Sequence, residues 1–348
     1  MQSKIYAELE GLRQANGLYT ASTGQFYQKF VWLRDTFYES LPNLLEAPEK
    51  YEETYRTLLS WLKKVEAKYS KFSAVIENPQ PKEAYRYLHA RIDVENFDEV
   101  HGNWGNKQHD AVGAILYGIA LGERAGITII KDNTDIEIIN LVYKYLEALE
   151  YWKDPDSGIW EEQEEIRASS IAAVWRGLRS MKSLCRADIS PKMDLITNAE
   201  EYLNRLFPYE TLTRHDDMAL LTLIFPFKAV NADCAKTIIY RVENALLRKN
   251  GVIRYKGDKY YNNHGKEAEW TMGLAFLGLA YAMLGDWEMA ENYYKMLNVD
   301  KCNGRIPELY FGGTDTPNEN NPLGWSCALT WLLKRSIITR NEAITGGY

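Results

Sequence analysis

The chain is poor in the residues that build metal and disulfide sites. Its 348 residues include only four Cys and five His, and none of them forms a CxxC or HExxH spacing, so the sequence does not support a structural zinc site. The Cys residues lie far apart, in helical or loop contexts, and are interpreted as free thiols in a reducing compartment. They are Cys185, Cys234, Cys302 and Cys327.

A long apolar run and an excess of basic charge are also missing. The longest apolar stretch, around residues 274–284, is about half of the ~20 residues that span a membrane. The N-terminal sequence is polar, with neither an apolar core segment nor a cleavage site of the signal-peptide type. With 41 Lys+Arg against 48 Asp+Glu, the net charge is −7, whereas nucleic acids require a concentrated basic face. We therefore expect a soluble, cytoplasmic protein that binds neither nucleic acid nor membrane.

Strand-like alternation is scarce, and helical periodicity dominates the chain. The pattern, together with start and stop signals, predicts about twelve helices. These helical stretches are 3–15, 31–45, 51–71, 81–91, 107–125, 134–152, 168–186, 191–207, 214–225, 231–249, 267–284 and 286–299, with a further one at 322–341.

No Ser/Gly linker, low-complexity run or 34-residue repeat divides the chain. The stretches 111–122 and 272–284 are apolar on nearly every face and rich in small residues, which is typical of buried helices that approach one another closely. In contrast, 51–71 and 286–299 are amphipathic, as outer helices are. We predict one all-α domain over residues 1–348, an (α/α)6 toroid in which six inner helices are ringed by six outer helices.

The aromatic content is high, with 24 Tyr, 10 Trp and 10 Phe making 13% of the chain. A large core is one explanation for this number. A sugar-binding surface is the other, because the faces of aromatic rings match the C–H faces of pyranose rings. Composition leaves both explanations open.

Five polar motifs fall between the predicted helices, where loops on a rigid scaffold carry function. They are residues 31–36 (VWLRDT), 104–111 (WGNKQHDA), 156–170 (DSGIWEEQEEIRASS), 253–262 with 267–270 (IRYKGDKYYN and EAEW), and 304–310 with 321–326 (GRIPELY and NPLGWS).

Each motif taken alone has an ordinary structural explanation. An Arg-Asp pair at a helix start, Arg34 and Asp35, suits a cap with a surface ion pair, and Asp110 suits the N-cap of a buried helix. The Glu-rich run after Trp160 suits a solvated loop. However, an apolar wall and neighbouring negative charge both raise a carboxyl pKa, and a general acid near neutral pH needs a raised pKa. Trp160 provides such an apolar wall beside a carboxyl group of this run.

Together the motifs provide the residue types that glycoside hydrolysis requires. They offer two separated carboxylates, an Arg-Asp pair, a further Arg and several Trp on one all-helical scaffold. Cleavage of a glycosidic bond needs one carboxylic acid to protonate the leaving oxygen and another to activate water.

The ordered set of motifs resembles glycoside hydrolase family 15, the glucoamylase family, and related domains of phosphorylase kinase regulatory subunits. Residues 32–35 (WLRD) resemble the family's W-x-R-D, and residues 104–110 (WGNKQHD) its W-G-x-x-Q-x-D. Residues 160–162 (WEE) and 168–170 (ASS) are similar to its W-E-E and A-S-S. Residues 254–261 (RYKGDKYY) resemble R-Y-x-x-D-x-Y-Y, and 307–309 with 322–326 resemble P-E-Q and P-L-x-W-S. One departure is Leu309, which stands where hydrolases of the family commonly have Gln. Pro-Glu-Leu-Tyr is the form of this motif in the kinase subunits.

The resemblance implies an inverting, exo-acting α-glucoside hydrolase that releases β-glucose from short α-linked gluco-oligosaccharides. In it, Glu161 would be the general acid and Glu308 the general base, with their carboxyl groups ~6.5–9.5 Å apart. No metal or other cofactor is needed, and the expected partner is a small oligosaccharide substrate. The implied substrate-binding residues are Arg34, Asp35, Trp104, Asp110, Trp160, Glu162, Arg254 and Trp325.

Two other function classes stay open at this point. The first is a non-catalytic carbohydrate-binding or regulatory domain of the kinase-subunit type, although retention of both Glu161 and Glu308 favours the enzyme. The second is an (α/α)6 enzyme with different chemistry, such as a lyase or phosphorylase, which no phosphate-binding loop or His/Cys metal set supports. The glycosidic linkage and the oligomeric state are left open as well.

Overall fold

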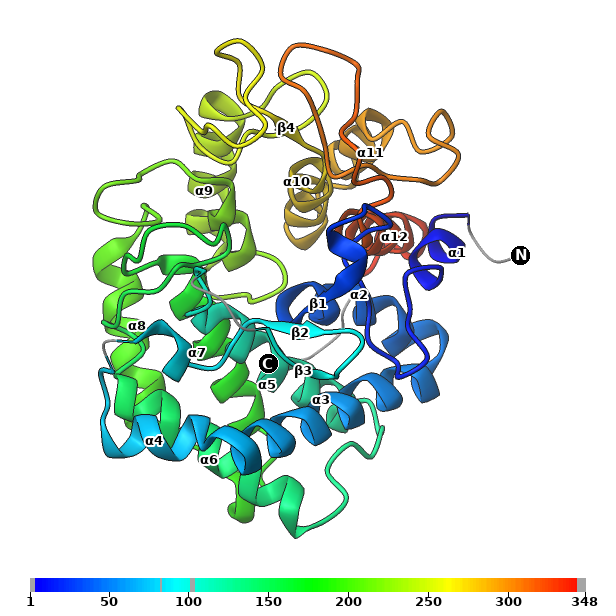
Figure 1. The fold of residues 1–348 in the computed structure, drawn as a ribbon. Coiled ribbons are helices and arrows are strands. Elements are labelled where there is room, and N and C mark those ends of the chain that lie inside the picture. The colour runs from blue at the N-terminus through cyan, green and yellow to red at the C-terminus, as the bar shows by residue number, and fades with distance from the viewer. Residues whose placement is uncertain (1–3, 82, 101–103, 343–348) are drawn as a thin grey trace.

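The computed structural model describes residues 4–81, 83–100 and 104–342, and it is mainly helical (Figure 1). This confirms the all-α prediction. The α-helices are α1 (Lys4–Glu10), α2 (Leu33–Glu46), α3 (Pro48–Tyr69), α4 (Lys71–Glu77), α5 (His109–Arg124), α6 (Asn133–Leu149), α7 (Ala168–Lys182), α8 (Met193–Leu206), α9 (Ala232–Ala245), α10 (Thr271–Met283), α11 (Trp287–Met296) and α12 (Gly324–Thr339).

Short strands and 3₁₀ turns connect the helices. Strands β1 (Phe30–Trp32), β2 (Arg91–Asp93) and β3 (Asp98–Glu99) form one antiparallel sheet in that order, and β4 (Glu269–Trp270) pairs with β5 (Leu309–Tyr310). The 3₁₀ turns are η1 (Tyr27–Lys29), η2 (Ala84–Arg86), η3 (Ala187–Ile189) and η4 (Met218–Leu223).

The helices predicted to be interior are buried. Every residue of α5 from His109 to Gly122 is buried, as is nearly all of α10, whereas α3 and α11 keep an exposed face. Small residues allow α5 to approach α7 closely. A Cβ placed on Gly113 would lie 2.4 Å from the backbone of Ala173 and Val174, and one on Gly177 would lie 2.5 Å from the carbonyl oxygen of Gly113.

Two of the predicted helices are wrong. The described residues of 81–91 contain only the turn η2 and the first residue of β2, because the backbone from Arg91 onward pairs with β1, with Trp32 opposite Arg91. Residues 214–225 contain only η4. The side chain of Asp217 caps this turn at Ala219, and the position before Pro226 disfavours the α conformation. The stretch predicted at 3–15 forms a helix only at α1, and residue 3 lies outside the described residues.

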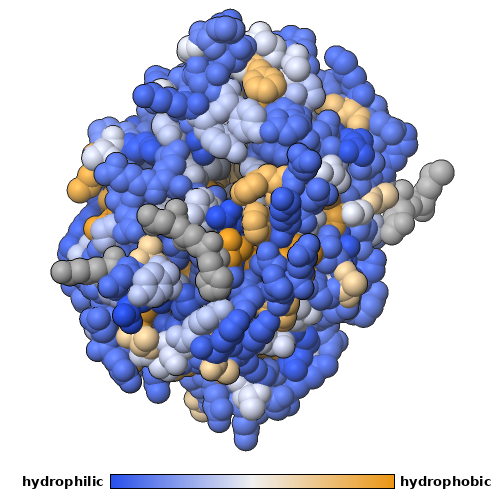
Figure 2. All heavy atoms as spheres, in the orientation of Figure 1, coloured by the Kyte–Doolittle hydropathy of each residue, from blue (hydrophilic) through white to orange (hydrophobic). Residues whose placement is uncertain are grey.

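Several helix N-termini converge at one end of the structure, and short strands hold them there. Strand β1 runs directly into α2, and β4 runs directly into α10. The loops that precede α5, α7 and α12 reach the same place (Figure 1). Figure 2 shows apolar side chains gathered in a hollow on this otherwise hydrophilic face.

Candidate active site

A cavity of about 670 Å³ opens at this convergence of helix N-termini. Nine of the ten residues that the sequence placed in the site line it together, although they come from six separate segments of the chain. These nine are Arg34, Asp35, Trp104, Trp160, Glu161, Glu162, Arg254, Glu308 and Trp325. The tenth, Asp110, is buried but does not line the cavity.

Glu161 reaches the cavity from the loop before α7, with φ at +61°, in the left-handed region. Its Oε1 accepts hydrogen bonds from Trp32 Nε1 at 2.8 Å and from Arg34 Nη2 at 3.1 Å. Burial raises the pKa of this carboxyl group, while the cations of Arg34 and Arg91 and the bond from Trp32 oppose the rise. A half-buried carboxyl with a raised pKa keeps a proton closer to neutral pH, as a general acid must.

Glu308 lies immediately before β5 and is 2% exposed. Three side chains donate to it: Tyr27 Oη to Oε1 at 3.0 Å, Asn318 Nδ2 to Oε2 at 2.5 Å, and Asn320 Nδ2 to Oε2 at 2.8 Å. Burial raises the pKa of Glu308, but these hydrogen bonds favour the ionised form and oppose that rise. A carboxylate held by three donors is suited to accept a proton from water.

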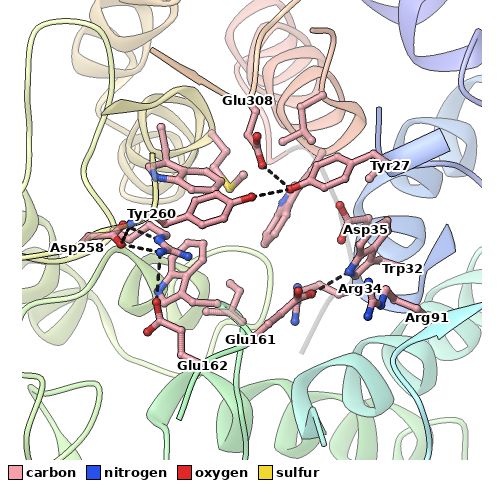
Figure 3. A pocket seen from close by; sticks show the side chains of 18 of the residues that line it. Tyr27, Trp32, Arg34, Asp35, Arg91, Glu161, Glu162, Asp258, Tyr260 and Glu308 are labelled. Carbon is pink, nitrogen blue, oxygen red and sulfur yellow. Dashed lines mark hydrogen bonds and ion pairs between the residues drawn. The ribbon is translucent and has the colours of Figure 1, made fainter. Parts of the chain in front are cut away.

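The two carboxyl groups approach the cavity from opposite sides (Figure 3). Glu308 comes from the segment near α12, and Glu161 comes from the loop before α7. This opposition is the arrangement an inverting pair needs, since water and leaving group lie on opposite faces of the sugar. The ~6.5–9.5 Å separation of their carboxyl groups stays a prediction.

Arg34 and Asp35 open α2, and both are buried. Arg34 Nη1 donates to Gln108 Oε1 and to Asp110 Oδ2, each at 2.9 Å. Burial raises the pKa of Asp35 to about 7; the charges of Glu161 and Glu308 add to this rise, and Arg34 opposes it. The pair is therefore not a surface ion pair with a capping role.

Asp110 acts through Arg34 instead of reaching the cavity. It is the second residue of α5, and the N-cap position is held by Gln108, so the simple interpretation of Asp110 as a helix cap is wrong. The distance of 2.9 Å to Arg34, with both side chains almost fully buried, makes this a charge-assisted hydrogen bond. Its effect is to fix the orientation of the Arg34 guanidinium beside Glu161.

Arg254 is held on the other side of the cavity by two acids. Its Nε and Nη2 each donate to Asp258 at 2.6 Å, and Nη2 lies 3.2 Å from Glu162 Oε1. Glu162 also accepts from Tyr255 Oη at 2.6 Å and from Arg214 Nη2 at 2.8 Å. This network fixes the side chain of Glu162, the residue that follows Glu161 in the chain.

The aromatic residues are divided between the core and the cavity. Trp61 is fully buried in the core. By contrast, aromatic rings gather around the cavity, namely Phe26, Tyr27, Trp32, Trp104, Trp160, Tyr255, Tyr260, Trp270 and Trp325. Such rings supply the apolar walls that a sugar ring packs against.

Sequence reasoning did not single out several of the lining residues, including Tyr27, Arg91, Tyr260 and Trp270. Tyr260 and Trp270 both lie inside a motif that was recognised, so both carried a signal. Tyr27 and Arg91 did not, because each owes its position to the β1–β2 pairing and the loops around it.

Within residues 4–81, 83–100 and 104–342, no group of three His, Cys, Asp or Glu side chains is arranged to hold a metal ion. In the same part of the chain, no helix has the length and apolar character that crossing a membrane would require. The four Cys residues are free.

Comparison with known proteins gives relatives of two kinds. The family model described as "Glycosyl hydrolases family 15" matches residues 1–216. A probable phosphorylase b kinase regulatory subunit alpha of Caenorhabditis elegans is 26% identical over 265 residues, which are 64% of this chain and 21% of that protein. The skeletal muscle isoform of Oryctolagus cuniculus is 24% identical over 273 residues, 67% of this chain and 22% of that protein. The chain thus spans about a fifth of these relatives.

Solved structures with the same fold cover nearly the whole chain. A wild-type glycosidase has a TM-score of 0.79 at 19% identity, covering 97% of this chain and 95% of its own. The glucoamylase from Saccharomycopsis fibuligera has a TM-score of 0.71 at 13% identity, covering 99% of this chain and 94% of its own. These likenesses confirm the (α/α)6 toroid. The family match covers more than half of the sequence, and the chain belongs to glycosyl hydrolases family 15.

Proposed function

We propose that this protein is an inverting, exo-acting α-glucoside hydrolase that releases β-glucose from short α-linked gluco-oligosaccharides. One observation carries the proposal: Glu161 and Glu308 face one cavity from opposite sides, in different environments. Glu161 stands beside tryptophans with a raised pKa, whereas Glu308 accepts three hydrogen bonds that favour its ionised form. Different environments for two carboxyl groups are what assign an acid and a base.

In the proposed reaction, protonated Glu161 gives its proton to the glycosidic oxygen as the bond from the anomeric carbon to that oxygen breaks. Water attacks the anomeric carbon from the opposite face, and ionised Glu308 takes the proton that this water loses. The new carbon–oxygen bond has inverted configuration, so an α-glucoside gives β-glucose. The transition state carries positive charge on the sugar, and the acidic side chains around the cavity stabilise it electrostatically.

The terminal sugar would lie against the inner end of the cavity. Arg34 and Asp35 offer charged hydrogen-bonding groups there. The ring of Trp325 also lines the cavity, stacked on Tyr38 at 4.5 Å between ring centroids. Charge-assisted hydrogen bonds orient the sugar hydroxyls as well as bind them. Arg254, already fixed by Asp258, would contribute from the opposite wall.

A second function has specific support. The kinase regulatory subunits are similar over about two thirds of this chain, and Leu309 has the form found in them. On this alternative, the cavity binds a glucan or oligosaccharide and no turnover follows. The presence of both Glu161 and Glu308 in the cavity favours the enzyme.

The test is glucose release from a panel of α-linked disaccharides and oligosaccharides, with the anomer of the first product followed by NMR. Initial β-glucose from one member would support inversion and identify the linkage. We expect Glu161→Gln to fold normally and to lose most turnover, whereas near-wild-type rates would exclude Glu161 as the acid. Binding measured by calorimetry without any glucose release would support the regulatory alternative.

A further inference from the structure

The cavity contains three arginines, and one of them differs from the other two. Arg34 forms ion pairs with Asp110 and Glu161, and Arg254 does so with Asp258 and Glu162. Arg91 also lines the cavity and is 6% exposed. Within the part of the chain that the structure describes, its guanidinium forms no ion pair.

Aromatic rings surround Arg91 and compensate its charge only in part. The guanidinium carbon lies 3.4 Å from the centroid of Trp104, 5.2 Å from Phe30 and 5.4 Å from Trp32. Cation–π contacts of this kind stabilise a cation. However, Nε of Arg91 is buried without a hydrogen-bond partner among the described residues, and burial lowers the pKa of the group. The charge of Glu161 opposes this lowering, but the two groups form no ion pair. A buried cation without an ion pair is costly, so an anion bound in the cavity would stabilise it.

In the proposed function the leaving-group side is the side of Glu161, and Arg91 lies near this carboxyl group. The positive charges of Arg34 and Arg91 both lower the pKa of Glu161, the residue that protonates the leaving oxygen in the proposed function. Arg34 has different neighbours, because it adjoins Asp35 in the chain and forms an ion pair with Asp110. Arg91 lies 6.0 Å from the ring of Phe26, which is 56% exposed at the mouth. Figure 3 shows Arg91 beside Trp32, away from Glu308.

We propose that Arg91 binds an anionic group on the leaving-group sugar, so that the preferred substrates are acidic α-glucosides, bearing a carboxylate or a phosphate. This inference rests on the proposed function, because the leaving-group side is defined by Glu161. A guanidinium presents a planar fork of N–H donors that matches carboxylate and phosphate oxygens in pairs. The Trp104 ring beneath Arg91 holds that fork flat, and the sugar to which the anion belongs would lie toward the exposed ring of Phe26.

The experiment compares two pairs of substrates, each made of an anionic compound and its neutral counterpart. Maltobionate and maltitol share the glucosyl group and the linkage, and they differ by a carboxylate in place of a hydroxymethyl group. Trehalose 6-phosphate and trehalose form the phosphate pair. We expect the ratio of kcat/KM, anionic over neutral, to be about 10- to 100-fold in the wild type for at least one pair, the range of a charged hydrogen bond. The pair with the higher ratio identifies the anion, and added salt should lower that ratio.

Variants at position 91 assign the preference to this residue. Arg91→Met keeps an unbranched stem against Trp104 but removes the charge, so the ratio should fall to about 1 or below. Arg91→Lys keeps the charge without the fork and should keep part of the ratio. Arg205→Met, which removes an arginine that is 67% exposed on α8, should leave the ratio unchanged. Because each variant is judged by its ratio, a general loss of rate does not affect the result.

A wild-type ratio of 1 or less for both pairs would overturn the proposal, whether or not Arg91→Met folds. A ratio unaltered in Arg91→Met would overturn it too. Calorimetry on Glu161→Gln with the same four compounds separates this inference from the proposed function. Glu161→Gln should bind an anionic compound more tightly than its neutral counterpart, and the double variant with Arg91→Met should lose this difference. That result would support the anion site even if no substrate is hydrolysed.

Discussion

The hydroxyl group of Tyr27 donates a hydrogen bond of 3.0 Å to Oε1 of Glu308, across 281 residues of sequence. Tyr27 lies in the turn η1, immediately before β1, and its hydroxyl is also 3.3 Å from that of Tyr260. Burial raises the pKa of the Tyr27 hydroxyl well above its ordinary value, so it stays a protonated donor. The proposed base is therefore positioned by groups from both ends of the chain.

Replacing Tyr27 by Phe removes this donor and tests its role. The hydrogen bond stabilises ionised Glu308, so its loss should raise the pKa of Glu308. In the proposed mechanism, Glu308 must be ionised, and the acidic limb of the kcat/KM profile should therefore move to higher pH. We expect kcat to fall about tenfold, the value of one hydrogen bond to a charged group. Tyr260→Phe, which leaves the bond to Glu308 in place, should move that limb less, and an unmoved limb in Tyr27→Phe would contradict this role.

Trp32→Phe should act on the opposite limb of the same profile. Trp32 Nε1 donates to Glu161 at 2.8 Å and lowers the pKa of that carboxyl group. Without this bond the pKa of Glu161 rises. Since the acid must be protonated, the basic limb should move to higher pH while the acidic limb stays in place. A shift of the acidic limb instead would mean that the acid and base roles are reversed.

Glu39 should make the stability of the fold depend on pH. It lies on α2, one turn after Asp35, is 0% exposed, and neither carboxyl oxygen has a hydrogen-bond partner among the described residues. Burial, with a smaller contribution from Asp35, raises the pKa of Glu39 well above its ordinary value. The folded state then binds a proton more tightly than the unfolded state. This stabilisation is complete below the unfolded pKa of about 4.3 and is lost as pH rises.

The measurement for Glu39 is urea unfolding of the wild type and Glu39→Gln between pH 5 and pH 8. The wild-type free energy of unfolding should fall more steeply, by up to about 1.4 kcal/mol per pH unit relative to the variant. Glu288→Gln, at an exposed position of α11, should follow the wild type. Parallel slopes for wild type and Glu39→Gln would mean that Glu39 is already ionised in the folded protein.

Gly113→Ala tests the contact between α5 and α7. The added methyl group would lie 2.4 Å from the backbone of the facing helix, which no side-chain rotation relieves. We expect destabilisation of about 1–3 kcal/mol from overpacking, although alanine is favoured over glycine within a helix by about 1 kcal/mol. Gly11→Ala, whose nearest neighbour would be the Glu8 carbonyl oxygen at 3.3 Å, should cost little. Thermal unfolding of both variants measures the difference, and a more stable Gly113→Ala would contradict the close approach.

Much of the helical framework follows from local sequence. The apolar, small-residue pattern of 111–122 and 272–284 predicts buried helices, and α5 and α10 are buried. Where the local pattern failed, at 81–91 and 214–225, neighbours in space determined the conformation. Pairing with β1 competes for the backbone of Arg91, and a cap from Asp217 sets the start of η4. Periodicity within one segment carries no information about such partners.

The sequence by itself determined which motifs are candidates for the site, because the residue types and their spacing in Trp-Glu-Glu and Pro-Glu-Leu are local properties of the chain. Tertiary structure alone decided how those motifs meet. It brought the hydroxyl group of Tyr27 within hydrogen-bond distance of Glu308, and it paired Asp110 with Arg34 outside the cavity lining. It also stacked the guanidinium of Arg91 over the ring of Trp104. The physical reason is that each of these contacts joins segments distant in sequence, through the packing of helices and the pairing of β1 with β2. Packing decides which side chains become neighbours, and hydrogen bonds and burial then set the orientation and pKa of those side chains.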